Sequence, residues 1–123
     1  MTRQGRDLNG DVLETVNRSA IVLEPTEKYL QWTRECPVGA PDISLDDLKE
    51  DVTVYLVPET DEEPEKILKR NYEAMFVNEL FAWCTDEAFW PKDRSFKVFK
   101  EFFNARFCSM VLDMADEPIG RDD

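Results

Sequence analysis

Two glutamates occupy corresponding places in the sequence, each beside a proline at the end of a short apolar run. Glu24 lies in LEPT and Glu59 lies in VPET. In a parallel sheet, ligands bind beyond the carboxyl ends of the strands, so adjacent strands would bring these two carboxylates into one cleft. Paired carboxylates can share a proton for acid–base catalysis or bind a divalent cation. Glutamate beside proline is also common at solvent-facing strand ends, and both interpretations stay open.

Other catalytic chemistry is limited because the chain of 123 residues contains no histidine. It therefore lacks the side chain that titrates near neutrality and is the commonest metal ligand. Neither a Ser–His–Asp triad nor a Cys–His pair can be assembled. Cys84 would be a nucleophile only if Lys92 or Arg94 lowered its pKa against the opposing effect of Asp86 and Glu87. We assign no catalytic residue, no metal site and no cofactor.

The cysteines and the N-terminus indicate where the protein resides. Cys36, Cys84 and Cys108 are odd in number and widely spaced, which is not the pattern of a disulfide framework or a zinc site. Buried free thiols in a reducing compartment are the expectation. The first residues are polar and resemble no secretory signal, and no run is long enough for a membrane helix. We therefore expect a cytoplasmic protein.

The charge distribution indicates the kind of partner. The formal net charge is −12, from 27 acidic and 15 basic residues, so binding to nucleic acid or to an anionic membrane is not expected. Residues 42–65 carry ten acidic residues and one basic, and Asp61, Glu62 and Glu63 are their densest run. A basic protein partner, or a homodimer in which acidic and basic faces meet, would suit this polarity. The simpler interpretation is a solvated surface that maintains solubility.

Aromatic residues are concentrated in the second half of the chain. Ten of the 14 aromatic residues fall between Phe76 and Phe107. A chain of this size needs that apolar area for its core, so we interpret most of these rings as core. Trp90 is the expected exception, because it precedes Pro91 in a turn beside Lys92 and Arg94. A partly exposed tryptophan in a rigid turn would mark a recognition surface.

Periodicity and capping signals predict the elements that position these residues. The predicted strands and helices are a strand over 20–23, helices over 26–36 and 44–51, a strand over 52–57, a helix over 65–84, a short helical turn over 85–90, a helix over 95–107 and a third strand over 107–114. Helix over 107–114 is the alternative, because that segment fits both periods. The order predicts a small α/β (or α+β) domain, with a sheet of about three strands, at least partly parallel, and three to four helices. Residues 1–16 are expected to form a mobile lead-in, residues 17–114 the single domain and residues 115–123 a polar tail.

Several segments in combination carry a family resemblance. They are NRSAIVLEP, LQW, SLDDLKEDVTVYLVPE, LFAWCTDEAFWP and FKEFFNARFCSMVLDM. Together they cover about Asn17 to Met114, and in this range the chain resembles a family of small acidic bacterial proteins of unassigned function. The resemblance implies a shared α/β fold. It brings no catalytic residues to this sequence.

Two functional expectations follow from the sequence. The first is a protein-interaction or regulatory module without catalysis, which uses the acidic segment and the turn around Trp90. The second is a small-molecule-binding protein or enzyme that uses Glu24 and Glu59. They differ in the surface that they require: a flat apolar or charged patch for the first, and a concave pocket around the two glutamates for the second.

Overall fold

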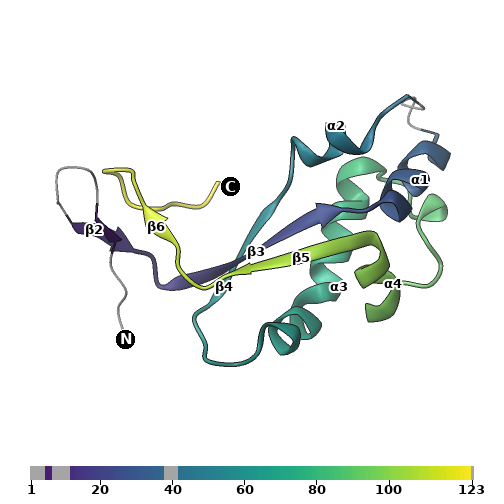
Figure 1. The fold of residues 1–123 in the computed structure, drawn as a ribbon. Coiled ribbons are helices and arrows are strands. Elements are labelled where there is room, and N and C mark those ends of the chain that lie inside the picture. Colours follow the sequence, from purple (N-terminus) through teal and green to yellow (C-terminus); the bar gives the residue numbers. More distant parts are fainter. Residues whose placement is uncertain (1–4, 7–11, 38–41, 123) are drawn as a thin grey trace.

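The main sheet consists of three strands that cross the middle of the molecule (Figure 1). A computed structural model describes residues 5–6, 12–37 and 42–122. Strands β3 (Arg18–Pro25), β4 (Val54–Pro58) and β5 (Phe103–Cys108) lie in the order β4-β3-β5, and both pairings with β3 are antiparallel. Four α-helices pack with this sheet, so the fold is α+β.

The expectation of a partly parallel sheet is wrong, because β3 and β4 pair in antiparallel register. The connection between them contains α1 (Glu27–Glu35) and α2 (Leu45–Lys49), of nine and five residues. At 1.5 Å per residue, α1 is only about 13 Å long. The two short helices return the chain to the end of β3, where Val54 pairs with Val22. A parallel pair would instead need a crossover along the full length of the strand.

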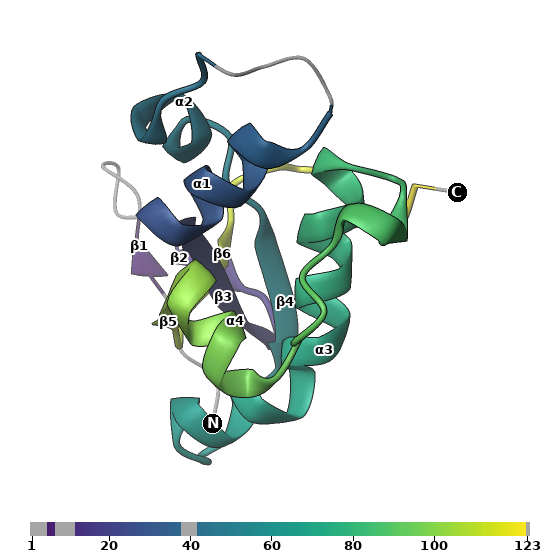
Figure 2. The ribbon, with the colours of Figure 1, turned by 90° about the vertical axis from the view of Figure 1, so that its right-hand side faces the viewer.

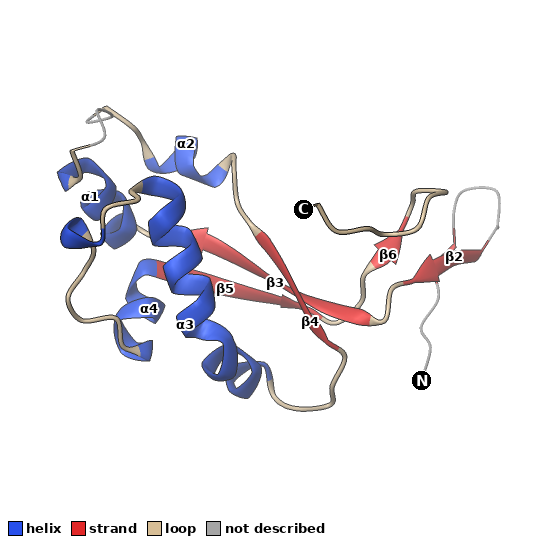
Figure 3. Cartoon of the chain, turned by 180° about the vertical axis from the view of Figure 1, so that it is seen from behind, coloured by secondary structure: helices blue, strands red, loops and turns tan. Residues whose placement is uncertain are grey.

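Strands β4 and β5 run in the same direction but are separated by β3. The chain moves from one edge of the sheet to the other through α3 (Pro64–Trp83), a short 3₁₀ helix (Glu87–Phe89) and α4 (Phe96–Phe102). Helix α3 has 20 residues, or about 30 Å, which is long enough to cover one face of the sheet. Figure 3 shows α3 lying across that face, and Figure 2 shows α1 and α4 beside it at one end.

Local sequence signals explain where the helices begin. The side chain of Ser44 accepts a hydrogen bond from the amide of Asp47, and the carboxylate of Asp47 accepts one from the amide of Ser44. This reciprocal capping box starts α2, as the sequence predicts. Helix α3 starts with a proline at its first position, where no N–H group is needed. Ser95 caps α4 through the amide of Val98.

A third strand exists, but it spans Phe103–Cys108 and not the predicted 107–114, so the predicted bounds of this strand and of the helix over 95–107 are wrong. Helix α4 ends at Phe102, whose carbonyl oxygen accepts hydrogen bonds from both the backbone amide and the hydroxyl of Thr26. Thr26 is the N-cap residue of α1, yet its side chain makes no capping bond and ties α4 to the end of β3 instead. In β5 Phe103 faces the core and Asn104 faces solvent, so strand alternation starts at once.

The aromatic core predicted from the sequence is present in the structure. Phe76, Phe99, Phe102 and Phe103 are buried and pack in tilted or edge-to-face pairs, with ring centroids 5.4–6.4 Å apart. These four rings come from α3, α4 and the start of β5. Phe81 and Phe89 are exceptions, since both are about half exposed.

A second, smaller antiparallel sheet lies at the end of the main sheet that is away from α1 (Figure 1). It contains β1 (Gly5–Arg6), β2 (Val12–Thr15) and β6 (Leu112–Asp113), in the order β1-β2-β6. The polar segment 1–16 shows no period that predicts β1 or β2, and its residues 1–4 and 7–11 lie outside the described part. Residues 115–122 contain neither helix nor strand. None of the described helices has the length and apolar character needed to cross a lipid bilayer.

Candidate functional site

The edge strand β4 presents apolar side chains to solvent. Tyr55 and Val57 point to the core side, and Val57 is buried. Val54 and Leu56 alternate with them on the other side and are 55% and 48% exposed. This strand forms because three of the four residues before the final proline of VYLVP are β-branched or aromatic. Within residues 5–6, 12–37 and 42–122, β4 has a strand neighbour on one side only.

The face of the main sheet opposite α3 carries apolar side chains from β4 and β3, which continue to Arg106 and Cys108 of β5. Val54 pairs with Val22, which pairs in turn with Arg106 of β5. Leu56 pairs with Ala20 in the same way, and Cys108 lies on the far side of Ala20. Directly paired residues share one face of a sheet, so these side chains form a continuous surface. No described helix covers this face in Figure 1.

Acidic residues flank β4 at both ends. Before the strand lie four exposed carboxylates on and after α2: Asp46, Asp47, Glu50 and Asp51. After it comes the turn with the predicted binding residues Glu59, Asp61, Glu62 and Glu63, all of them exposed. The two groups are separated by residues 52–58, of which the five residues of β4 alone span about 17 Å. The acidic segment of the sequence is therefore divided in space into two clusters, with an apolar strand between them.

Local contacts in the second acidic cluster leave most of its charge facing solvent. Glu62 pairs with Arg70 at 2.5 Å on an exposed surface, and its amide donates to the hydroxyl of Thr60 at 3.1 Å. Glu63 is the N-cap residue of α3, although its side chain makes no capping bond. Carboxylates are favoured at this position by the helix dipole.

Glu24 and Glu59 do not share a cleft. Glu24 is next to the end of β3 and pairs with Asn104, whereas Glu59 follows Pro58, which pairs with Arg18 at the start of β3. At about 3.3 Å per residue, the two carboxylates lie about 20 Å apart along the sheet. Their apparent equivalence in the sequence assumed parallel strands, and the antiparallel pairing separates them. Glu24 instead forms an ion pair of 3.0 Å with Arg106.

Trp90 is buried, which corrects the expectation of a partly exposed ring. Only 6% of the residue is exposed, and its indole N–H donates to the carbonyl oxygen of Cys84 at 2.7 Å. The guanidinium group of Arg94 lies 5.7 Å from the ring centroid. The turn folds the indole inward because this hydrogen bond closes the loop between α3 and α4. The neighbouring Phe89 is the ring that the turn leaves exposed.

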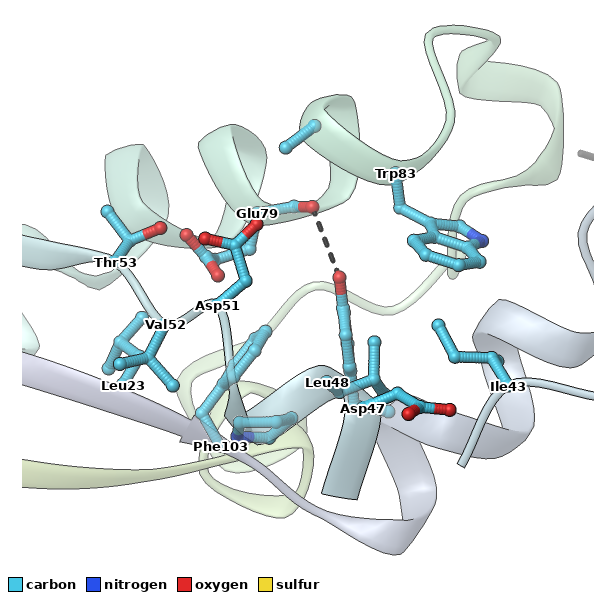
Figure 4. Close-up of a pocket in the computed structure, with 13 residues that line it drawn as sticks. Leu23, Ile43, Asp47, Leu48, Asp51, Val52, Thr53, Glu79, Trp83 and Phe103 are labelled. Carbon is cyan, nitrogen blue, oxygen red and sulfur yellow. Dashed lines mark hydrogen bonds between the residues drawn. The ribbon is translucent and has the colours of Figure 1, made fainter. Parts of the chain in front are cut away.

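A hollow of about 260 Å³ lies between α2 and α3, beside the residues that lead into β4. We call it the α2–α3 hollow. Three carboxylates line it, those of Asp47, Asp51 and Glu79. Its aromatic and aliphatic lining includes Tyr29, Ile43, Leu48, Trp83 and Phe103. Figure 4 shows Trp83 and Glu79 approaching from α3 and Leu48 and Asp47 from the opposite side.

The carboxylate of Glu79 is oriented by a hydrogen bond from the edge strand. The hydroxyl of Tyr55 donates to Glu79 Oε2 and accepts a hydrogen bond of 3.0 Å from the side-chain amide of Asn78. Burial, together with the bond to Glu79, raises the pKa of Tyr55 well above its usual range. Tyr29, also in the hollow, donates to the backbone carbonyl of Glu79 at 3.4 Å (dashed in Figure 4). Burial raises the pKa of Tyr29 as well.

The negative charge of the hollow has no basic partner within the described part of the chain. The ion pairs found there are Lys28–Glu101, Arg70–Glu62, Lys100–Glu65 and Arg106–Glu24. Asp47 is engaged with Ser44, whose backbone and side chain lower its pKa. Among the same residues, no group of three histidine, cysteine or acidic side chains is arranged to hold a metal ion.

Sequence reasoning did not predict the α2–α3 hollow. Asp47 and Asp51 belong to the acidic segment, and the aromatic pattern predicts that Trp83 is core, but no pattern assigns a role to Glu79. The available signal was the spacing of Glu79 and Trp83, which lie four residues, or about one helical turn, apart on α3. That spacing places both on one face of the helix, but it cannot show that α2 lies opposite.

The cysteines differ in burial. Cys36 and Cys84 are buried free thiols, as expected, while Cys108 is a free thiol exposed on β5. Burial, assisted by the nearby Cys84, raises the pKa of Cys36 to about 11. The thiol of Cys84 donates a weak hydrogen bond to the carbonyl oxygen of Asp86. The thiolate form of Cys36 is thus disfavoured, which is typical of a structural cysteine.

Comparison of the chain with models of known protein families, with curated proteins and with solved structures finds no match.

Proposed function

We propose that this chain is a protein-interaction module that pairs a basic, extended segment of another protein with the free edge of β4, without catalysing a reaction. The observation that supports this proposal is the combination at β4 of an unpaired strand edge, exposed Val54 and Leu56, and an acidic cluster at each end. A free strand edge offers backbone donors and acceptors to an incoming strand, and alternate side chains give specificity.

The two edges of the main sheet differ in how well they resist such pairing. Natural edge strands are commonly protected by charged side chains, proline or bulges. Strand β5 carries Asn104 and the charged Arg106, which fits that pattern. Strand β4 has no charged residue, and its one proline, Pro58, stands at its last position. Strand β4 is therefore the edge that is open to a partner.

Charge favours a basic partner over a second copy of this chain. In an antiparallel β4–β4 pairing, the α2 end of one copy would meet the 59–63 end of the other, and both are acidic. Like charges brought together at an interface oppose association. A segment with lysine or arginine at both ends would instead meet opposite charge at both ends and would also be attracted by the net charge of −12.

Titration with designed peptides tests this proposal. The probe is a peptide of alternating threonine and valine with two lysines at each end. We expect its binding to protect amides among residues 54–57 from hydrogen exchange and to weaken as salt rises. A peptide with the lysines replaced by glutamates controls for charge, and one methylated on alternate backbone nitrogens controls for strand pairing. Equal binding of the methylated peptide would contradict pairing with β4.

Matched protein variants locate the charge effect. One variant neutralises four flanking carboxylates: Asp46→Asn, Glu50→Gln, Asp61→Asn and Glu63→Gln. The control neutralises four exposed carboxylates elsewhere: Glu27→Gln, Glu35→Gln, Glu73→Gln and Glu87→Gln. We expect about tenfold weaker peptide binding for the first and little change for the second. Equal losses would mean that net charge, not the position of the clusters, drives binding. Sedimentation of the free protein shows whether β4 pairs with a second copy instead.

A further inference from the structure

The α2–α3 hollow opens at the same edge of the sheet as the proposed docking strand. Its lining includes Asp51, Val52 and Thr53, the three residues directly before Val54 of β4. A segment paired with β4 would therefore have one end beside the hollow. The volume of about 260 Å³ is below the usual range for pockets of drug-sized ligands, so the hollow suits one side chain better than a whole cofactor.

The lining selects for a positively charged group with an apolar stem. Trp83 and Tyr29 offer aromatic faces, and aromatic faces attract cations. Asp51 and Glu79 supply negative charge that no lysine or arginine pairs with in the described part of the chain. Leu48 adds aliphatic surface for a stem. Arginine and lysine side chains have this combination of an apolar stem and a charged end.

Glu79 is held in place before any ligand arrives. Its carboxylate accepts a hydrogen bond from Tyr55, and Tyr55 in turn accepts one from Asn78 at 3.0 Å. Because Tyr55 belongs to β4 and Glu79 to α3, this chain of bonds couples the docking strand to the hollow. A carboxylate that is already oriented loses less conformational entropy when it binds a cation.

We propose that the α2–α3 hollow receives the guanidinium or ammonium end of a side chain from the segment docked on β4, with Glu79 as the principal counter-charge. This inference rests on the proposed function, because it names the anchor residue of that partner. The group sits against the Trp83 ring and between the carboxylates of Glu79 and Asp51.

A double-mutant cycle with arginine peptides tests the proposal. Two versions of the docking peptide are used, one with an arginine at its N-terminal end and one with an arginine at its C-terminal end. One of the two arginines then lies beside the hollow whether the peptide pairs with β4 in parallel or in antiparallel direction. In each, the arginine is also replaced by citrulline, which has nearly the same shape without the charge. The protein variants are Glu79→Gln and, as a control on the same helix, Glu73→Gln. Thermal unfolding verifies that each variant is folded.

For one of the two peptides, we expect the change to citrulline to weaken binding to the native protein about tenfold or more. The same change should have little effect on binding to the Glu79→Gln variant, because the counter-charge is already absent. In the Glu73→Gln variant the full loss should remain. The inference is wrong if the change to citrulline weakens binding to Glu79→Gln as much as it weakens binding to the native protein. The two losses of affinity would then be additive, and the arginine would not contact Glu79.

Titration with ethylguanidinium separates this inference from the proposed function. Its binding is followed by the NMR signal of the Trp83 indole N–H, with Glu79→Gln as the control. If the peptides pair with β4 but neither citrulline nor Glu79→Gln alters their affinity, the docking function stands and the anchor is overturned. If ethylguanidinium binds while no peptide does, the hollow is a site for free small cations and both statements about a partner are overturned.

Discussion

The hydroxyl of Tyr55 on the edge strand donates a hydrogen bond to the carboxylate of Glu79 on α3. This bond joins β4, the edge strand without charged residues, to α3, the helix that covers one face of the main sheet. Removing the hydroxyl in Tyr55→Phe should destabilise the fold by about 1–3 kcal/mol, because a bond to a charged acceptor is lost and the ring remains. Urea unfolding measures the change. In the control Tyr72→Phe, where the hydroxyl makes only a 3.4 Å contact with Glu73, the change should be below about 0.5 kcal/mol.

Alkaline pH should destabilise the protein through its buried tyrosines. Burial raises the pKa of Tyr29 in the folded state above its unfolded value near 10. The folded state therefore favours the protonated phenol, and this contribution is complete below pH 10 and lost as pH rises further. We expect the free energy of unfolding to fall by up to about 1.4 kcal/mol per pH unit above pH 10 for this group. Denaturant unfolding at several pH values checks this, and the fall should be shallower in Tyr29→Phe.

Much of the fold could be predicted from local patterns. The capping box at Ser44, the apolar stripe of α3 and the β-branched run at β4 each have a short-range signal, and each appears where the sequence places it. The end of α4 has no such signal. Phe99, Phe102 and Phe103 fit a helical stripe, but Thr26 binds the last carbonyl groups of α4 and starts a strand at Phe103. That contact spans 76 residues, so local periodicity cannot reveal it.

The candidate site was less accessible to sequence reasoning because it depends on strand direction. Glu24 and Glu59 look equivalent only if their strands are parallel, and the short α1 and α2 make them antiparallel. The same return of the chain places α2 opposite α3 and so creates the hollow around Glu79. Acidic residues between 42 and 65 were recognised as a cluster, but their division by β4 follows only from the structure.

The thiols should differ in reactivity in the native state. Cys108 is exposed, while Cys36 and Cys84 are buried. Because the pKa of Cys36 is raised to about 11, its reactive thiolate is scarce at neutral pH. Dithiobis(nitrobenzoate) should therefore modify one thiol rapidly and the other two only after unfolding in urea. Replacement of the exposed thiol in Cys108→Ser should remove the rapid phase. A rapid phase that persists in that variant would show that the region around Cys36 and Cys84 opens readily.

Neutralising Glu24 should have little effect. Its ion pair with Arg106 is exposed, with 73% of the arginine side chain accessible to solvent. Exposed pairs contribute about 0–1 kcal/mol, so Glu24→Gln and Arg106→Gln should each change the free energy of unfolding by less than about 1 kcal/mol. Binding of the lysine peptide to β4 should be unchanged, because Glu24 pairs with Asn104 of β5 and lies beyond the residues of β3 that pair with β4. A loss of peptide affinity in Glu24→Gln would mean that the partner crosses the open face of the sheet.

The three tryptophans should respond differently to an aqueous quencher. Trp32 and Trp90 are 7% and 6% exposed. All three indole N–H groups donate to backbone carbonyl groups, so the tryptophans differ in burial and not in this bond. Trp83 is partly exposed and lines the α2–α3 hollow. Iodide should therefore quench a minor component of the fluorescence, and Trp83→Phe should remove that component while Trp90→Phe leaves it. Because iodide is an anion and the hollow is acidic, neutral acrylamide should quench Trp83 more strongly than iodide does. If iodide is the stronger quencher at low salt, the hollow is not negatively charged, and a positively charged anchor residue would have no electrostatic reason to enter it.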